Sequence, residues 1–284
     1  MEIQLSPRKN KEHKRVIAVI LCAGKGTRIK EIFPSTPKSL IKIEAFNNDP
    51  ILGNLISNLI DLKVNLIDIV IGYLGFQIKE YINFLKATGE KKYTIISIIN
   101  AEKEYQKGPL YSFLSINKNF EKYLKDDIFL VLPGDTIFSK SLLKNVLRII
   151  TIQHVIFRET PAIFYQIIKT DDLLQLSKVS YSILESLPER EGFYHIKSIE
   201  RENLNKSKGS VKKVVPIICF PYILIRDMLN ITLKMDFNSI RELINFLIKE
   251  KGQRFEFYEL SSKYKFYDID SERDLTIFNK KSGQ

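Results

Sequence analysis

The stretch VIAVILCAGKGTR, residues 16–28, decides the fold of this 284-residue chain. Its first part, Val16–Cys22, is an unbroken and largely β-branched apolar run, which is typical of a strand buried on both faces of a parallel sheet. Gly24 and Gly26 follow directly. The stretch therefore predicts a central strand that ends in a tight loop where the backbone can approach a ligand closely.

Apolar runs and helical patterns alternate along the first half of the chain. Helical spacing is found over Asp49–Leu62, Phe76–Lys86 and Leu110–Leu124. Strand-like runs lie at Asp68–Tyr73, Tyr93–Ile99 and Ile128–Leu132. This alternation predicts an α/β fold with a single doubly wound, mostly parallel sheet.

The second half is less regular, and we expect antiparallel strands to be added to the sheet there. Strands are predicted at Ala162–Ile168, Gly192–Ile199, from Val211 onward and at Phe255–Leu260, with a polar surface loop over Asn203–Gly209. Helices are predicted at Lys140–Ile149, Ser239–Lys249 and Ser271–Asn279, with Ser271 as the N-cap of the last. The sequence contains no internal repeat and no sign of a second core.

Composition excludes several classes of protein. Hydrophobic residues make up 44% of the chain, an ordinary value for a globular protein. No apolar run approaches the roughly 18 residues that a membrane-spanning helix needs, so we expect no membrane association. Cys22 and Cys219 lie in apolar surroundings without metal-ligand spacing, which favours buried, reduced thiols and a cytoplasmic location.

The net charge of +11 fits an enzyme that handles polyphosphates, a nucleic-acid binder or a solvated basic surface. Residues 1–14 form a basic leader, which we expect to be flexible, and the remaining lysines are scattered among acids. We therefore expect no nucleic-acid partner. The alternative is a nucleic-acid-binding role led by this leader.

The loop after the first strand has the character of an anion-binding loop. Glycines at such a position let backbone N–H groups approach phosphate oxygens. The Rossmann pattern would need a third glycine at Ile29, and the Walker pattern does not match either. Arg28 and, ten residues later, Lys38 place two cations beside the loop.

With Ala23-Gly24-Lys25-Gly26-Thr27-Arg28 and Pro37-Lys38-Ser39-Leu40, the chain resembles the sugar-phosphate nucleotidyltransferase family, whose signature is A-G-x-G-T-R followed by P-K-x-L. Similar segments follow in the family's order: Asn48–Leu52, Ile69–Tyr73 with Ile78 and Tyr81, Leu132–Asp135, and Tyr267–Asp270 with Asp274-Leu275. The resemblance covers about residues 15 to 280. It implies a Rossmann-like nucleotidyltransferase fold over 15–284, with a nucleotide-binding half at 15–136 and an acceptor-binding half at 137–284.

The resemblance also implies an activity. A nucleoside monophosphate would pass from a nucleoside triphosphate to a phosphorylated small molecule, foremost a sugar 1-phosphate, with release of pyrophosphate. Arg28 suits the β- and γ-phosphates because its planar fork can engage two oxygens. Lys38 would stabilise charge that develops at the α-phosphate. The expected nucleotide contacts are Leu21, Ala23, Gly24, Lys25, Gly26, Thr27 and Gly108.

The implied cofactor is Mg²⁺, which binds oxygen ligands and often takes only one or two carboxylates besides phosphates. Asp135 is the first candidate ligand, with Asp268 or Asp270 as its partner. We expect only one of these two to point at the metal, and the resemblance favours Asp268. No general base is needed, because a phosphate monoester is already largely ionised at neutral pH.

Two departures from the family pattern leave the substrates open. Where hexose 1-phosphate enzymes have E-K-P, this chain has Glu200-Arg201-Glu202, so Arg201 is the candidate for the acceptor's phosphate. Lys107–Ser112 lacks the T-G-T-A or D-G-L-A form, and its Tyr111-Ser112 is similar to the Y-S-L of phosphocholine cytidylyltransferases. Tyr111 is therefore a second candidate contact with the acceptor.

Two alternatives to a sugar 1-phosphate enzyme follow. One is a CTP-dependent cytidylyltransferase for phosphocholine or another small phosphorylated alcohol or amino compound. The other is a non-catalytic interaction module of the same fold, which the presence of Arg28, Lys38 and Asp135 argues against. The resemblance also implies a homo-oligomer.

Overall fold

The computed structural model describes residues 15–29, 31–169, 181–190, 193–202 and 209–282. The basic leader at 1–14 and most of the predicted loop at 203–209 lie outside these residues. Among the helices of the described segments, none is both long and apolar enough to cross a membrane.

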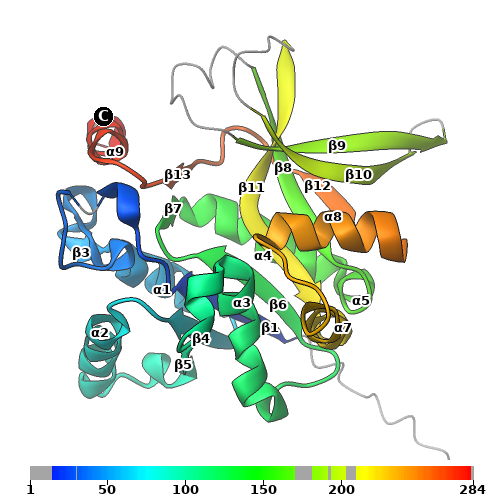
Figure 1. The fold of residues 1–284 in the computed structure, drawn as a ribbon. Coiled ribbons are helices and arrows are strands. Elements are labelled where there is room, and N and C mark those ends of the chain that lie inside the picture. The colour runs from blue at the N-terminus through cyan, green and yellow to red at the C-terminus, as the bar shows by residue number, and fades with distance from the viewer. Residues whose placement is uncertain (1–14, 30, 170–180, 191–192, 203–208, 283–284) are drawn as a thin grey trace, which may run out of the picture.

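Four parallel strands form the centre of the molecule (Figure 1). They are β1 (Val16–Cys22), β4 (Leu66–Ile71), β5 (Ile96–Asn100) and β6 (Ile128–Pro133). The order across the sheet is β6-β1-β4-β5, so the chain first moves from β1 to β4 and β5 and then crosses to the other side of β1. A topological switch point therefore lies between β1 and β6, where open α/β sheets bind ligands.

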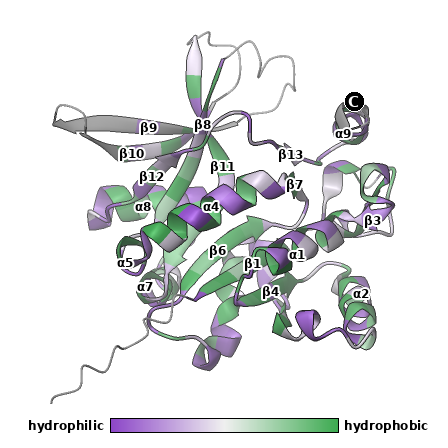
Figure 2. Cartoon of the chain, turned by 180° about the vertical axis from the view of Figure 1, so that it is seen from behind, coloured by the Kyte–Doolittle hydropathy of each residue, from purple (hydrophilic) through white to green (hydrophobic). Residues whose placement is uncertain are grey.

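Helices cover both faces of this sheet, as the continuous apolar pattern of β1 predicts. Ala18 and Ile20 pack with α1 (Ile51–Asp61), α2 (Gly75–Ala87), α4 (Lys140–Ile152) and α5 (His154–Phe157). Ile17 and Val19 point to the opposite core, with α3 (Pro109–Leu114), α7 (Tyr222–Thr232) and α8 (Ile240–Lys251). Figures 1 and 2 show these two helix layers from opposite sides, with apolar strands between them.

The second half extends the sheet with antiparallel strands, as predicted. The long strand β11 (Ser210–Pro221) pairs with β6, with β8 (Ala162–Lys169) and at Lys213 with β9 (Tyr181–Arg190). β9 forms an antiparallel pair with β10 (Phe193–Glu202), and β12 (Glu256–Glu259) pairs with β8 in parallel. The register of β11 against β8 shifts between Val214 and Ile218, so the strand is irregular between its two halves.

A third, smaller core joins the C-terminal segment to the region after β1. Here β13 (Phe266–Asp268) pairs with β7 (Thr136–Phe138), and β2 (Lys42–Ile43) with β3 (Asp49–Pro50). The closing helix α9 (Glu272–Ser282) begins after Ser271, whose hydroxyl accepts a hydrogen bond from the Asp274 N–H and thus confirms the predicted cap. This C-terminal core consists of Ile29, Ile41, Ile43, Ile51, Ile137, Ile269 and Phe278.

Several elements differ from the sequence prediction. The helix expected over Leu110–Leu124 ends at Leu114 and continues as a 3₁₀ segment over Ser115–Lys122, with non-helical angles at Asn119. The strand expected from Tyr93 starts only at Ile96. Strand β9 and helix α7 were not predicted at all.

Candidate nucleotide-binding site

The site lies at the carboxyl ends of β1 and β6, at the switch point. Gly134 follows β6 and donates its N–H to the Leu21 carbonyl at 3.0 Å. A Cβ atom on Gly134 would stand 2.3 Å from the Cys22 sulfur and 3.1 Å from the Leu21 carbonyl oxygen. Only glycine permits this close approach, which places Asp135 directly beside the loop that follows β1.

That loop exposes backbone donors. Gly24 has open space where a side chain would be, and Gly26 has a positive φ of 59°. Within the described part of the chain, the N–H groups of Gly24, Lys25 and Gly26 donate no backbone or side-chain hydrogen bond. A short loop with several unbonded N–H groups is suited to an anion.

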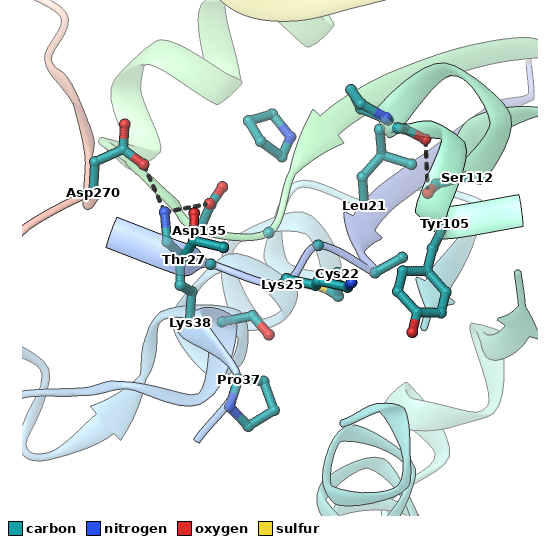
Figure 3. A pocket seen from close by; sticks show the side chains of 18 of the residues that line it. Leu21, Cys22, Lys25, Thr27, Pro37, Lys38, Tyr105, Ser112, Asp135 and Asp270 are labelled. Atoms are coloured by element: carbon teal, nitrogen blue, oxygen red, sulfur yellow. Dashed lines mark hydrogen bonds and ion pairs between the residues drawn. The ribbon is translucent and has the colours of Figure 1, made fainter. Parts of the chain in front are cut away.

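Lys38 lies at the start of a 3₁₀ turn, Lys38–Leu40, and its aliphatic stem passes directly over Gly26. Its ammonium nitrogen lies 2.6 Å from Asp270 Oδ1 and 3.4 Å from Asp135 Oδ2 (Figure 3). Only 11% of the side chain is exposed. Arg28 also reaches this group, with its Nη1 atom 2.8 Å from Asp270 Oδ2, but more than half of its side chain is exposed.

A cavity of ≈ 420 Å³ opens between these groups. One part is lined by the glycine loop and the charged cluster of Arg28, Lys38, Asp135 and Asp270. The other is lined by Leu21 together with Tyr105, Gly108, Pro109 and Ser112. Gly108 has a φ of 112° and precedes α3, so it forms a sharp bend into the helix. The cavity thus combines a charged end with a less polar end.

The acidic residues influence one another. Burial within the surrounding walls raises the pKa of Asp135, Lys38 lowers it and Asp270 raises it further. The same holds for Asp268, whose pKa is raised by burial and lowered by the Thr136 hydrogen bond and by Lys213. Water still reaches both carboxylates, since 38% of the Asp135 side chain is accessible and Asp268 is exposed.

Most of the predicted residues come together in the cavity. All seven expected nucleotide contacts line it: Leu21, Ala23, Gly24, Lys25, Gly26, Thr27 and Gly108. The three expected catalytic residues, Arg28, Lys38 and Asp135, line it as well. Their roles stay predictions, but their juxtaposition is a feature of the structure.

The two aspartates near the C-terminus lie differently from the expectation, and which of them binds a metal stays a prediction. Asp270, and not the favoured Asp268, lines the cavity and pairs with Lys38. Nor does only one of the two face this region: residues two apart in an extended segment share a side, and Asp268 lies close enough to Asp135 for the charge of Asp135 to raise the pKa of Asp268. The buried Ile269 between them points into the C-terminal core. Asp268 instead accepts a 2.7 Å hydrogen bond from Thr136.

The two candidate acceptor contacts are not in the cavity lining. The Tyr111 hydroxyl donates to Asp236 at 3.1 Å and accepts from the Phe237 N–H at 3.2 Å. Successive helix residues point about 100° apart, so its neighbour Ser112 faces the cavity in its place. Arg201 is an exposed residue near the end of β10, opposite Ser182.

Sequence reasoning missed Tyr105 as a lining residue. Its ring lies against Gly72, where a Cβ atom would stand 2.7 Å from the ring. Gly72 was part of the family-like segment ending at Tyr73 and could have indicated a close contact. The sequence could not show that this contact is Tyr105, which lies some thirty residues further along the chain. The pairing of Asp270 with both Arg28 and Lys38 was also missed, because these residues lie far apart in the sequence.

The fold and this site define an α/β protein with a glycine loop and two cations in one cavity at the end of its first strand, an arrangement suited to a polyanion. The chain belongs to the family of MobA-like NTP transferase domains, which matches residues 18–196, more than half of its length.

Individual relatives are similar over shorter segments. The chain is 30% identical over 125 residues to the UTP–glucose-1-phosphate uridylyltransferase AglF of Haloferax volcanii, covering 44% of this chain and 45% of that protein. It is 35% identical over 83 residues to the choline-phosphate cytidylyltransferase of Streptococcus pneumoniae, covering 29% of this chain and 31% of that protein. The matches thus span less than half of these curated relatives.

The fold is similar over nearly the whole chain to solved structures. The UDP-glucose pyrophosphorylase of Acinetobacter baumannii superposes with a TM-score of 0.66 at 16% identity, covering 93% of this chain and 91% of that one. The mostly parallel sheet with antiparallel additions is therefore the Rossmann-like nucleotidyltransferase fold that the sequence predicted.

Proposed function

We propose that this protein transfers a nucleoside monophosphate from a nucleoside triphosphate to a sugar 1-phosphate and releases pyrophosphate. One observation carries the proposal: a glycine loop with unbonded N–H groups, two cations and two carboxylates meet in one cavity at the switch point of the sheet. Attack by the acceptor's phosphate oxygen on the α-phosphorus forms one P–O bond and breaks the bond to the β-phosphate, which leaves with its electron pair as pyrophosphate.

The loop of Gly24, Lys25 and Gly26 binds the triphosphate tail in this proposal. Its N–H groups supply directed hydrogen bonds, and Arg28 adds a planar fork that can engage two phosphate oxygens. The exposed Arg28 side chain can turn from Asp270 toward a phosphate at small cost. The nucleobase then lies at the less polar end, beside Tyr105 and Ser112.

Lys38 acts at the reacting phosphorus. Its stem is held against Gly26, so its ammonium group stays within a narrow region of the cavity. Charge accumulates on the α-phosphate oxygens and the leaving pyrophosphate in the transition state, and a nearby fixed cation stabilises it. Lys38 exchanges one of its carboxylate partners for a phosphate oxygen when it does so.

Asp135 and Asp270 would hold the Mg²⁺ ion. In the described residues, no cluster of three or more acidic, histidine or cysteine side chains forms a protein-only metal site. Mg²⁺ needs no such cluster, and two carboxylates that already share the Lys38 cation and face a phosphate-binding loop fit it. A bound ion would neutralise phosphate charge in the transition state. Asp268, held by Thr136, supports this acidic group from the adjacent side.

The acceptor is proposed to be a sugar 1-phosphate because the uridylyltransferase relative, named for glucose 1-phosphate, matches the longer segment. The experiment is a screen of four nucleoside triphosphates against hexose 1-phosphates and phosphocholine, with Mg²⁺, following pyrophosphate release. We expect turnover with one triphosphate and a hexose 1-phosphate. Release of pyrophosphate from none of the pairs would reject the proposed function.

A cytidylyltransferase acting on phosphocholine is the second candidate. The similarity to the choline-phosphate cytidylyltransferase and the Tyr111-Ser112 pair favour it. Turnover confined to CTP with phosphocholine in the same screen would select it over the sugar 1-phosphate reaction.

A further inference from the structure

A second cavity, of ≈ 610 Å³, lies beside another face of α3 than the one that lines the nucleotide cavity. It is enclosed by α3, α7, the 3₁₀ turn Glu104–Lys107 and the 3₁₀ segment Ser115–Lys122 (Figure 1). Its volume falls within the range of small-molecule sites, about 300–1,000 Å³. The proposed reaction gives this second cavity no role.

The deeper part of the second cavity is apolar and partly aromatic. Its lining includes Tyr111 and Leu114, which are buried, and Leu229, which is half-buried. The amide side chains of Asn117 and Asn230 also line it and are exposed. A flat ring with polar edges fits this lining better than a hydrocarbon chain does, because the amides can form hydrogen bonds with the edge of the ring.

Three exposed cations line the second cavity, namely Lys107, Lys118 and Arg226. Lys107 pairs with Glu104 at 3.0 Å, and Lys118 pairs with Glu102 at 2.8 Å. Exposed pairs of this kind contribute little, so each lysine can exchange its carboxylate for a phosphate at small cost. In the part of the chain that the structure describes, Arg226 has no ion-pair partner. Its planar fork can therefore take two phosphate oxygens without giving up another contact.

The two cavities share the turn Glu104–Lys107. Tyr105 lines the nucleotide cavity at its less polar end, whereas Glu104 and Lys107 line the second cavity. The Tyr105 ring is closely fitted, because it fills the space beside Gly72 where a Cβ atom would otherwise stand. A ligand that draws Lys107 away from Glu104 should therefore shift the turn and displace Tyr105 from this place.

We propose that the second cavity binds a nucleoside phosphate as a regulatory ligand and that this binding weakens nucleotide binding in the catalytic cavity. The base lies against Tyr111 and Leu114, and the phosphates lie at Arg226 and the two lysines. The regulatory part of this inference rests on the proposed function, because it needs a nucleotide in the first cavity. The ligand is either the triphosphate substrate itself or a different nucleotide, and the experiment separates these two sources.

The first test is calorimetric titration of ATP, GTP, CTP and UTP, each with Mg²⁺ and without acceptor. In the unmodified chain, the substrate triphosphate should bind twice per chain, or a triphosphate that is not a substrate should bind once. Arg226→Glu should lower the affinity of this additional site about 10- to 100-fold, because a charge-assisted hydrogen bond is lost. Leu233→Glu is a second variant without cost to the fold, since Leu233 lines the cavity and is 85% exposed. Arg148→Glu is the matched control, because Arg148 is exposed on α4 and lines neither cavity.

The second test measures the coupling between the two cavities in the reaction that the screen selects. If the regulatory nucleotide is the substrate, velocity against its concentration should give a Hill coefficient below 1, and Arg226→Glu should restore a simple hyperbola. If it is another triphosphate, its addition should raise the KM for the substrate about fivefold or more in the unmodified chain. In Arg226→Glu the same addition should leave the KM within about twofold.

Three results would overturn the inference while the proposed function stands. These are the absence of any binding event that Arg226→Glu and Leu233→Glu weaken, an equal loss in Arg148→Glu, and binding in the second cavity that leaves the KM unchanged. If the unmodified chain releases pyrophosphate with no pair, the proposed function fails separately. The titration needs no turnover and then decides the inference: a binding event that is lost in Arg226→Glu but kept in Arg148→Glu supports it, and the absence of such an event overturns it.

Discussion

Asp135 is the residue whose chemistry is most specific to the proposed reaction. It lies directly after Gly134, at the closest approach of β6 to β1, and its carboxylate faces Lys38 across the cavity. A carboxylate here can hold a divalent cation, whereas an amide of the same shape is a much weaker ligand. The side chain carries little of the core, so its charge can be removed without loss of packing.

We therefore predict that Asp135→Asn lowers kcat by about 10³-fold or more, because several kcal/mol of transition-state stabilisation depend on the metal. The measurement is pyrophosphate release over a range of Mg²⁺ concentrations, with circular dichroism to verify the fold. Asp61→Asn is the control, since Asp61 is an exposed partner of Lys140 outside the cavity. Near-normal turnover of Asp135→Asn would reject the metal assignment.

Lys38 is predicted to act in the transition state more than in binding. Lys38→Ala should lower kcat by about 10²- to 10³-fold, the range found when one electrostatic stabiliser of developing charge is removed. The KM for the triphosphate should change much less, because the glycine loop and Arg28 remain. Lys42→Ala, an exposed lysine four residues further along, serves as the control. The reverse pattern, a large KM change with intact kcat, would make Lys38 a ground-state binding residue.

At the scale of elements, the glycine loop leaves room for the side chain of Lys38 at Gly26. A Cβ atom on Gly26 would stand 2.8 Å from the Lys38 Cγ atom, and the loop has a left-handed backbone there. Gly89 has a similar φ of 75° but no atom within 4 Å of such a Cβ. A substitution at either glycine strains the backbone, but only a substitution at Gly26 also displaces Lys38. Comparing the two therefore distinguishes these effects.

We predict that Gly26→Ala and Gly89→Ala cost similar stability, about 1 kcal/mol each, from the left-handed conformation. Only Gly26→Ala should lower kcat, because it moves Lys38. Thermal unfolding and turnover measured on both variants test this pairing. Equal turnover in the two variants would mean that the Lys38 position is not set by Gly26.

The C-terminal core determines how the charged residues meet. Ile29 follows Arg28, Ile269 precedes Asp270, and Ile41 lies one turn after Lys38, so each charged residue is attached to a buried isoleucine. This explains how segments more than 200 residues apart in sequence reach one site. This core is small. A substitution that weakens its packing should therefore lower activity at a temperature where the rest of the protein is still folded.

Ile269→Ala should destabilise the protein by roughly 2–5 kcal/mol, the range for removing a large buried aliphatic side chain. Ile225→Ala, on the buried face of α7 in the opposite core, should cost a similar amount. At a temperature where both variants are folded, only Ile269→Ala should lose turnover, because Asp270 shifts. A matching loss in Ile225→Ala would show that the effect is one of general stability.

The elements that sequence predicted best are those with local signals. The strand β1, the glycine loop and the cap at Ser271 each follow from a short pattern, and the predicted parallel half was found. Helix α7 was missed because apolar, β-branched residues continue across Pro221, and only the interruption at that proline separates strand from helix. Strand β9 contains charges and Pro188, and it depends on pairing with β10.

The site was predictable where its residues follow one another in sequence, and less so where distant segments meet. Arg28 and Lys38 belong to one motif, whereas choosing Asp270 over Asp268 requires the packing of Ile269. The position of Tyr111 outside the cavity lining could not be predicted, because a motif carries no information on helix rotation.

At the scale of the whole molecule, the reactivity of both cysteines shows whether the same core layer is folded. Cys22 ends β1 and Cys219 lies in β11, and both belong to the core layer to which α1 and α4 also contribute. Burial raises the pKa of Cys22 to about 12 and also raises the pKa of Cys219. Because the thiolate is the reactive form, about one Cys22 thiol in 10⁴ would be ionised at pH 8.

We predict that iodoacetamide at pH 8 leaves the native protein unlabelled and adds two labels per chain after denaturation in urea, one for each cysteine. Intermediate urea concentrations should label Cys22 and Cys219 together, because one sheet holds both and must open to expose either. Mass spectrometry of the digested protein measures each site separately. If Cys22 reacted in the native protein while Cys219 did not, the end of β1 would open independently, and the fixed approach of Gly134 to this strand, on which the position of Asp135 depends, would be wrong.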